Sequence, residues 1–261
     1  MGKAIAIVNQ KGGVGKTTTA VNLAASLGLY GYKTLLVDVD PQGNATSGLG
    51  YNKREIELST YEMIVSEVKA EEILLTTDFD NLDLLPSNMN LAGAELELVN
   101  LESREKRIKT ALAPMTEIYD FIILDCPPSL GLLTVNILCA VDTVLVPIQC
   151  EYFALEGLSQ LMSTIRQVKR LYNSLIDVEG VLLTMFDGRL NLTQQVVSEV
   201  QRFFPKKVYQ TVIPRNVRLS EAPSFGLPVY YYDKASRGSK AYCEFAQEFL
   251  GKNNKKVKTE K

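Results

Sequence analysis

The sequence predicts an α/β fold in which a single doubly wound, mainly parallel sheet carries helices on both faces. Two features favour this fold. Short apolar runs lack polar–apolar alternation, which is typical of strands covered on both sides. These runs alternate with segments of helix length, and this order indicates parallel strands joined by crossover helices. A chain of 261 residues, 46% of them hydrophobic, is long enough to bury such a sheet.

The predicted strands can be followed along the chain. The first, KAIAIVN at 3–9, leads directly into a glycine-rich loop. The second, KTLLVDVD at 33–40, contains two aspartates near its end. Apolar runs of the same kind occupy 81–86, 119–126, 142–148 and 179–186. A tyrosine cluster, VYYYD at 229–233, is also interpreted as a strand.

Helices are expected between these strands. The first covers 17–29 and ends before Gly31, which suits a C-terminal cap. The other predicted helices are 89–98, 105–112, 155–172, 192–203 and 240–250. Residues 1–250 are expected to form one domain. Residues 251–261, GKNNKKVKTEK, are polar and rich in lysine, and we expect them to be a disordered tail.

Charge is divided unevenly along the chain. Residues 1–150 contain 11 Lys+Arg and 19 Asp+Glu, a net charge of −8, and residues 151–261 contain 17 and 11, a net charge of +6, which sum to the total of −2. The basic second half favours an anionic partner, although a solvated surface explains it equally well. The chain has no histidine, which argues against zinc sites and His-based triads. No apolar stretch is long enough to span a bilayer.

The stretch VNQKGGVGKTTTAVNL is almost a phosphate-binding loop. The usual pattern is Gly, four residues, then Gly-Lys-Ser/Thr. Gly15, Lys16 and Thr17 fit, but Gln10 replaces the first glycine and Lys11 adds a charge. Between a strand and a helix, backbone N–H groups and the helix N-terminus attract phosphate. We expect Lys16 to reach the β- and γ-phosphates and Thr17 to bind Mg²⁺, as in a P-loop NTPase.

Three aspartates lie at the ends of predicted strands. Asp38 and Asp40 close the second strand, and Asp125 closes the run FIILD. Ligands of open α/β sheets bind beyond the carboxyl ends of the strands. A buried carboxylate is costly unless it is paired or bound to a metal. Any one of these acids could instead cap a helix, but three of them beside Gly-Lys-Thr predict Mg²⁺ held with a nucleotide.

Several motifs together resemble one protein family. KGGVGKT, DVDPQGN and ILDCPPSLG look like the deviant Walker A ATPases. QCEYFALEGL, GVLLTMFDGR and VIPRNVRLSEAPSFGLPV resemble the ParA/Soj-type chromosome-partitioning ATPases, and the resemblance spans about residues 2–250. It implies a cytoplasmic, nucleoid-associated enzyme that dimerises on binding ATP and Mg²⁺ and hydrolyses ATP slowly. Such an enzyme drives the partitioning of chromosomes or plasmids.

The same resemblance implies roles for individual residues. Lys11 is expected to reach the ATP of the partner protomer, although contact with its own phosphates is the alternative. Lys11, Lys16 and Asp40 form the implied catalytic set, in which Asp40 positions the attacking water. Asp38 is expected near the metal, and Asp125 is expected to hold Mg²⁺ through water, alongside Thr17. The implied nucleotide-binding residues are Lys11, Gly12, Gly13, Val14, Gly15, Lys16, Thr17, Thr18, Pro214, Arg215 and Asn216.

The resemblance also implies macromolecular partners. Arg189 and Arg218 match arginines with which the family binds double-stranded DNA without sequence preference. An ATP-dependent homodimer doubles such phosphate contacts and therefore binds DNA more strongly. A ParB-type centromere-binding protein is the expected activator of hydrolysis. Control of replication initiation is a further implication.

Other functions share parts of this pattern. A MinD-like, membrane-associated cell-division ATPase would need an amphipathic C-terminal helix, but the tail contains only Val257 as a bulky apolar residue. A metabolic P-loop ligase is the alternative from a different class, and nothing in the sequence marks its substrate pocket. Iron–sulfur carriers would need ligating cysteines at suitable spacing, and bacterial tyrosine kinases a tyrosine-rich tail. A protein that only binds ATP would release no phosphate.

Overall fold

The computed structural model describes residues 2–151 and 154–259. Within them, one twisted sheet has the strand order β3-β4-β2-β5-β1-β6-β7. Neighbouring strands pair in parallel, apart from the short antiparallel pair β3 and β4 at one edge. The strands are β1 Lys3–Ile7, β2 Thr34–Asp38, β3 Leu75–Thr76, β4 Leu82–Leu85, β5 Phe121–Asp125, β6 Thr143–Gln149 and β7 Asp177–Thr184.

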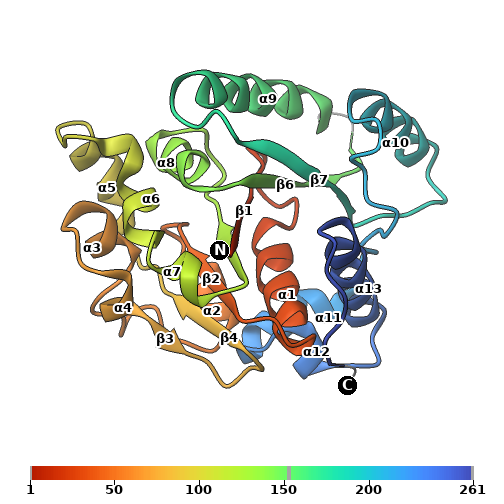
Figure 1. Cartoon of the computed structure of the whole chain (residues 1–261). Coiled ribbons are helices and arrows are strands. Elements are labelled where there is room, and N and C mark those ends of the chain that lie inside the picture. The colour runs from red at the N-terminus through yellow and green to blue at the C-terminus, as the bar shows by residue number, and fades with distance from the viewer. Residues whose placement is uncertain (1, 152–153, 260–261) are drawn as a thin grey trace.

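Helices cover both faces of this sheet, which confirms the predicted fold class (Figure 1). One face packs against α1 Lys16–Leu29, α2 Asn44–Gly48, α11 Val217–Glu221, α12 Val229–Tyr232 and α13 Arg237–Lys252. The other face packs against α3 Thr60–Val65, α4 Ala70–Ile73, α5 Leu91–Leu98, α6 Arg107–Leu112, α7 Met115–Ile118, α8 Leu132–Ala140, α9 Ala154–Leu171 and α10 Asn191–Phe203.

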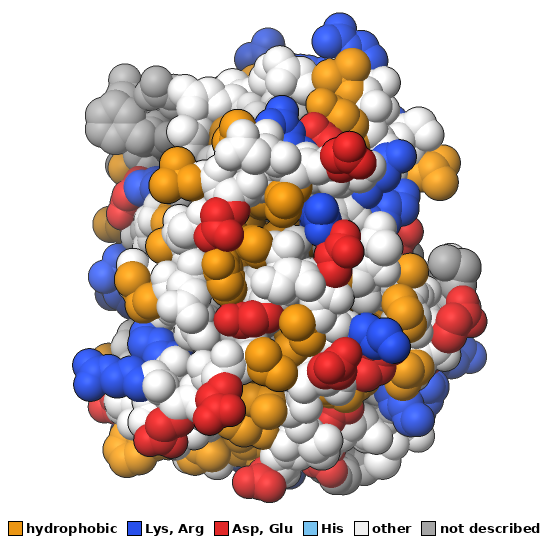
Figure 2. Space-filling view, turned by 90° about the vertical axis from the view of Figure 1, so that its left-hand side faces the viewer, with side chains coloured by type: hydrophobic (Ala, Val, Ile, Leu, Met, Phe, Trp, Pro, Cys, Tyr) orange, Lys and Arg blue, Asp and Glu red, His pale blue; other side chains and the backbone are white. Residues whose placement is uncertain are grey.

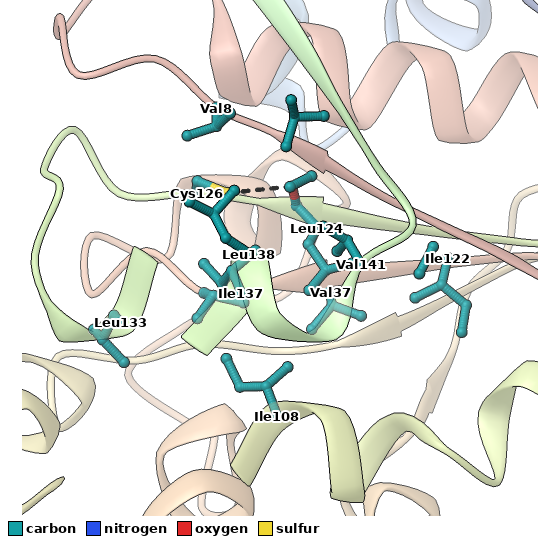
Figure 3. Close-up of a cluster of buried hydrophobic side chains, with 14 of the residues drawn as sticks. Val8, Val37, Ile108, Ile122, Leu124, Cys126, Leu133, Ile137, Leu138 and Val141 are labelled. Carbon is teal, nitrogen blue, oxygen red and sulfur yellow. Dashed lines mark hydrogen bonds between the residues drawn. The ribbon is translucent and has the colours of Figure 1, made fainter. Parts of the chain in front are cut away.

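The central strands explain why the sequence shows apolar runs without alternation. Ile5 and Ile7 of β1 belong to the core on the α1 side, and Ala4 and Ala6 belong to the core on the opposite side. Both sets are buried, so each position along the strand must be apolar. Figure 3 shows part of the second core, in which side chains of β2 and β5 meet those of α8, such as Ile137.

Both ends of α1 depend on left-handed backbone conformations. Gly15, with φ of 86°, directly precedes the helix, and no side chain caps the N-terminus. The first N–H groups of α1 are therefore available to a ligand. At the other end, Gly31 has φ of 85°, and its N–H donates to the carbonyl oxygen of Gly28. The predicted helix 17–29 and its glycine cap thus match the structure to within one residue.

The tyrosine cluster at 229–233 was wrongly predicted as a strand, because it forms the helical turn α12. Pro228 precedes this turn, and its carbonyl oxygen accepts from the N–H of Tyr231 at 3.0 Å. The N–H of Val229 donates to Asn22 Oδ1 of α1 at 2.7 Å. The N–H groups of Val229 and Tyr231 thus find acceptors in α1 and in the turn itself, so this segment does not need to pair with a strand. Helix α8 was not predicted, because its mostly apolar sequence has no amphipathic periodicity.

The tail differs from the expected disordered segment. Helix α13 continues to Lys252, and residues 253–259 run along the amino ends of the strands. The hydroxyl of Tyr32 donates to the carbonyl oxygen of Lys256 at 2.6 Å, and the Lys258 ammonium lies 4.0 Å from the Tyr32 ring centre. The Tyr32 ring and the Asp120 carboxylate attract the ammonium groups of Lys255 and Lys258, and composition alone does not reveal these contacts. Residues 260–261 lie outside the described part of the chain.

We predict that truncation after Lys252 destabilises the protein. The truncated chain loses the bond from Tyr32, the cation–π contact of Lys258, and the bonds that Asn253 makes with Lys3 and Glu179. We expect the free energy of unfolding in urea to fall by about 1–3 kcal/mol. Lys256→Ala is the control, because this exposed residue contacts Tyr32 through its carbonyl oxygen, and it should leave the free energy unchanged. Equal stability of the truncated chain and the control would contradict the docked tail.

Candidate nucleotide and metal site

The loop between β1 and α1 leaves open space beside its glycines. Gly13 has φ of 74° and Gly15 has φ of 86°. Residues other than glycine rarely adopt this left-handed backbone conformation. A Cβ atom added to Gly12 or Gly13 would meet no atom within 4 Å. The loop backbone is therefore accessible to a ligand at the N-terminus of α1, as a phosphate-binding loop requires.

Neighbouring strands hold this loop in place. Asn9 Nδ2 donates to the carbonyl oxygen of Pro147 on β6 at 2.8 Å, and Asn9 Oδ1 accepts from the N–H of Lys11 at 3.0 Å. Thr184, at the end of β7, donates its hydroxyl to the carbonyl oxygen of Val14 at 2.8 Å. The loop is thus anchored at both of its ends before any ligand binds. Asn9 and Thr184 were not predicted from the sequence, because the contacts of Asn9 with Pro147 and of Thr184 with Val14 join distant parts of the chain.

Lys16 places a cation inside the site. Only 6% of the residue is exposed, and its ammonium donates to the carbonyl oxygen of Lys11 at 3.0 Å. Burial lowers the pKa of Lys16, and the charge of Asp125 is the largest of those that oppose this change. An anion at the open loop would stabilise the charged ammonium. The role of Lys16 toward phosphate stays a prediction.

Asp125 is a buried carboxyl group that the protein satisfies poorly. Neither of its side-chain oxygens has a hydrogen bond of normal geometry among the described residues, and only the Thr17 hydroxyl is near enough to lower its pKa by weaker hydrogen bonding. Burial, followed by the charge of Asp38, raises its pKa well above the usual value, while Thr17 and Lys16 lower it by less. A buried polar group that lacks a partner calls for an explanation, and a cation with its water shell supplies one here.

Asp38 lies beside Asp125 because β2 and β5 are paired in register at these residues. Unlike Asp125, it is fully engaged by protein groups. Its Oδ2 accepts from the N–H and the hydroxyl of Thr46, both at 2.8 Å, and its Oδ1 accepts from the N–H of Asp40 at 3.2 Å. Burial, as the main cause, raises the pKa of Asp38 to about 6.

Asp40 is tied to the same cluster through its backbone. Its carbonyl oxygen accepts from the hydroxyl of Ser87 at 2.8 Å, and the N–H of Ser87 donates to Thr46 Oγ1 at 2.9 Å. Its carboxylate accepts from the N–H of Gln42 at 2.9 Å. A continuous chain of hydrogen bonds thus joins Asp38, Thr46, Ser87 and Asp40. Thr46 and Ser87 were not predicted, because no sequence spacing links them to the aspartates.

Lys11 projects from the loop toward a carboxylate of its own chain. Its ammonium forms an ion pair with Glu151, just after β6, and the pair is partly exposed. The two motif lysines therefore differ in their surroundings, because Lys16 is buried against the loop and Lys11 lies near the surface. Glu151 was not singled out from the sequence. Part of the motif that contains it, QCEYFALEGL, lies outside the described residues, namely 152–153.

The segment 214–216 runs beside the end of β7. The N–H of Phe186 donates to the carbonyl oxygen of Ile213, and Phe186 and Pro214 form a parallel bridge. Pro214, Arg215 and Glu151 help to line a hollow of about 730 Å³. Asn216 has a local structural role as well, because its Oδ1 accepts from the N–H of Arg218 at 3.0 Å and caps α11.

The two predicted DNA-binding arginines lie on the surface, and each is paired with acidic groups. Arg189 follows β7 and binds Asp187. Arg218 lies on α11 and binds Glu221 and Asp233. Neither arginine has an unpaired guanidinium. These acidic partners were not predicted from the sequence.

The described residues contain no group of three or more His, Cys, Asp and Glu side chains suited to holding a metal. Mg²⁺ does not require such a cage, because it keeps several waters and is bound through one or two carboxylates together with phosphates. Asp125, with its unsatisfied oxygens, and Thr17, at the start of α1, are suited to that arrangement. No described helix is long and apolar enough to cross a membrane.

Comparisons with known proteins identify close relatives. A family model described as an AAA domain matches residues 2–178. The sporulation initiation inhibitor protein Soj of Bacillus subtilis is 57% identical over 95% of this chain and 98% of its own. The chromosome partitioning protein ParA of Myxococcus xanthus is 52% identical over 98% of this chain and 90% of its own. A structure of cobyrinic acid a,c-diamide synthase of Mycobacterium smegmatis, with bound ATP analogue and magnesium, is 36% identical, with a TM-score of 0.84 and full coverage of both chains.

We predict that Asp125→Asn reduces the pH dependence of stability in nucleotide-free protein. The raised pKa means that folded Asp125 keeps its proton to higher pH than the unfolded chain does. The contribution of Asp125 to the stability of the parent protein therefore falls as pH rises above about 4. At pH 8 the variant should unfold in urea with a free energy about 1–3 kcal/mol higher than the parent, and the difference should shrink toward pH 4. Glu117→Gln, at an exposed position, is the control. An identical pH profile in the parent and Asp125→Asn would contradict this reading.

Proposed function

Because the chain belongs to the Soj/ParA family of chromosome-partitioning ATPases, we propose that ATP joins two copies of it into a dimer that binds DNA and is reset by hydrolysis. Its cofactors are ATP and Mg²⁺, in keeping with the nucleotide- and magnesium-bound structures of similar proteins. The observation that carries the proposal is the buried, unpartnered carboxyl of Asp125 beside the buried ammonium of Lys16. A magnesium-bound polyphosphate satisfies both groups at once.

Residues of the loop and the strand ends divide the chemistry between them. Backbone N–H groups of the glycine loop and the ammonium of Lys16 hold the phosphates, and the Thr17 hydroxyl and Asp125 hold Mg²⁺ directly or through water. Asp38 supports the metal side of the site by fixing Thr46 and the backbone of Asp40. The carboxylate of Asp40 orients the attacking water. Mg²⁺ neutralises charge on the phosphates when it is bound.

Lys11 supplies the contact between the two protomers. Its ammonium lies near the surface and pairs with Glu151. The ammonium of Lys16, by contrast, donates to the loop backbone at the carbonyl oxygen of Lys11. A partly exposed ion pair contributes at most about 1 kcal/mol, so Lys11 can exchange this carboxylate for a phosphate of the partner protomer. A cation supplied in trans stabilises charge on the nucleotide, as an arginine finger does.

DNA is the macromolecular ligand that the dimer binds. Arg189 and Arg218 contact phosphates without reading sequence, and a dimer presents each of them twice. A ParB-type centromere-binding protein stimulates hydrolysis and returns the dimer to monomers. The protein acts in the cytoplasm on the nucleoid, and it also influences replication initiation.

A metabolic ligase is the second candidate, because one similar solved structure is named as a cobyrinic acid a,c-diamide synthase. Higher identity to Soj and ParA favours partitioning instead. DNA mobility shifts with ATP, with ADP and without nucleotide separate the two functions. Retardation by the ATP form alone supports partitioning, and its absence at low salt contradicts it.

We predict that Lys11→Ala binds ATP yet remains monomeric. Lys16 and the loop backbone are unchanged, so nucleotide affinity should stay within about threefold of the parent, whereas the dimer loses its contact in trans. Light scattering with ATP in a hydrolysis-deficient Asp40→Ala background measures the mass. Glu151→Gln is the matched control, since it releases Lys11 without removing it, and it should still dimerise. An ATP-dependent dimer of Lys11→Ala would exclude the role in trans.

We also predict that Arg218→Glu retains the ATP-dependent dimer and loses DNA binding. The substitution reverses the charge at a position that meets phosphate twice per dimer, which should weaken binding at least tenfold at about 100 mM salt. Mobility shifts measure DNA binding and light scattering measures the dimer. Unchanged retardation of DNA would remove Arg218 from the DNA surface.

A further inference from the structure

We propose that Asp187, Glu221 and Asp233 limit the affinity of this protein for DNA by holding Arg189 and Arg218 within its own chain. The inference rests on the proposed DNA-binding function and adds three acidic residues to it. These residues act through the arginines and through direct repulsion of phosphate. They are affinity-setting residues, because they do not themselves bind the polyanion.

The first pair is Asp187 with Arg189. Arg189 Nε donates to Asp187 Oδ1 at 2.8 Å and Nη2 donates to Oδ2 at 2.6 Å, so the contact is bidentate. The N–H of Arg189 also donates to Oδ1, at 3.1 Å. These hydrogen bonds lower the pKa of Asp187 to about 2, so the carboxylate is charged at neutral pH. Although 89% of the Arg189 side chain is exposed, its guanidinium is not an unpaired cation.

The second group surrounds Arg218 more fully. Its Nη1 donates to Glu221 Oε2 at 2.7 Å, and its Nε lies 3.3 Å from Asp233 Oδ2. The guanidinium carbon lies 6.0 Å from the ring centre of Tyr232, whose hydroxyl donates to Glu221 at 3.2 Å. Asp233 is fixed in turn by the N–H of Ala235, at 3.1 Å. Arg218 therefore meets two carboxylates and one aromatic face.

A count of charges shows what these contacts do. Arg189 with Asp187 has a formal charge of zero, and Arg218 with Glu221 and Asp233 has a formal charge of −1. The two arginines thus present no excess positive charge to a polyanion. Other cations lie in the same half of the chain, including Arg215 and Arg237, which line the hollow beside Arg189. These cations supply the general attraction, which the three carboxylates reduce.

Binding of a phosphate requires each arginine to exchange partners. The exchange itself is easy, because exposed ion pairs contribute about 0–1 kcal/mol. The displaced carboxylates nevertheless remain beside the phosphates and repel them. A dimer contains every one of these groups twice, so the repulsion is doubled together with the attraction. Binding therefore stays weak enough to be reversed when the dimer separates.

The opposite role for the carboxylates is that they orient the arginines for DNA. In that case their removal would weaken binding. The two roles predict changes of opposite sign, which makes them separable by measurement. The face over α3 to α6 provides a comparison, because Lys and Arg alternate there with Asp and Glu across the surface (Figure 2). Exposed acids on that side can be neutralised without touching either arginine.

The test uses the double variant Glu221→Gln/Asp233→Asn and, separately, Asp187→Asn in the full chain. Both are measured with ATP and a duplex of arbitrary sequence by fluorescence anisotropy at two salt concentrations. The double variant changes the Arg218 group from −1 to +1, so we expect affinity to rise about tenfold and the salt dependence to steepen. Asp187→Asn should raise affinity about threefold. The matched control Glu71→Gln/Glu72→Gln removes two exposed charges from α4 and should change affinity less than twofold.

The outcomes distinguish this proposal from the function on which it rests. Tighter, more salt-sensitive binding by the double variant and by Asp187→Asn, but not by the α4 control, supports the proposal. If both neutralised variants bind no more tightly than the parent while Arg218→Glu loses binding, the acidic residues do not limit affinity and the proposed function stands. If affinity for DNA rises equally in the α4 control, the change in net charge alone explains the effect, and the proposal is overturned. If the parent with ATP does not bind DNA, both are overturned.

Discussion

Two carboxyl groups on adjacent strands impose the strongest constraint on this protein. The parallel register of β2 and β5 places Asp38 directly beside Asp125, and both are fully buried. Protein donors satisfy Asp38, but Asp125 has no hydrogen-bond partner among the described residues. Burial of these two carboxyl groups destabilises the fold at the carboxyl ends of β2 and β5, and a metal-bound nucleotide relieves this destabilisation. Ligand binding and the stability of that edge are consequently two aspects of the same interaction.

Much of the fold could be predicted because burial on both faces leaves a plain sequence pattern. Strands such as β1, with apolar residues in both cores, lie within the predicted runs. Prediction failed where local contacts outweighed composition. The tyrosine-rich segment 229–233 suggested a strand, but hydrogen bonds to Pro228 and Asn22 close a helical turn. The lysine-rich tail suggested disorder, but the Tyr32 ring and Asp120 bind its lysines.

The candidate site follows the same division. Lys16, Thr17 and the strand-end aspartates could be found because the phosphate loop has a fixed spacing and parallel strands share one carboxyl edge. Their individual roles stay predictions. Thr46 and Ser87, which bind Asp38 and the backbone of Asp40, could not be found, because only the folded chain brings them there. Glu221 lies three residues from Arg218 and could have been noticed on one helix face, whereas Asp233 could not.

The position of the chain ends has a practical consequence. Lys3 begins β1 at the amino edge of the sheet, and residues 253–258 pack along that same edge, against Tyr30 and Tyr32. The glycine loop lies at the opposite edge. A fluorescent protein or an immobilising tag fused before Gly2 or after Thr259 would therefore be joined on the side of the molecule away from the glycine loop. Imaging and surface-capture designs can use these two positions, but a tag joined directly to Lys252 would remove the contacts of the docked segment.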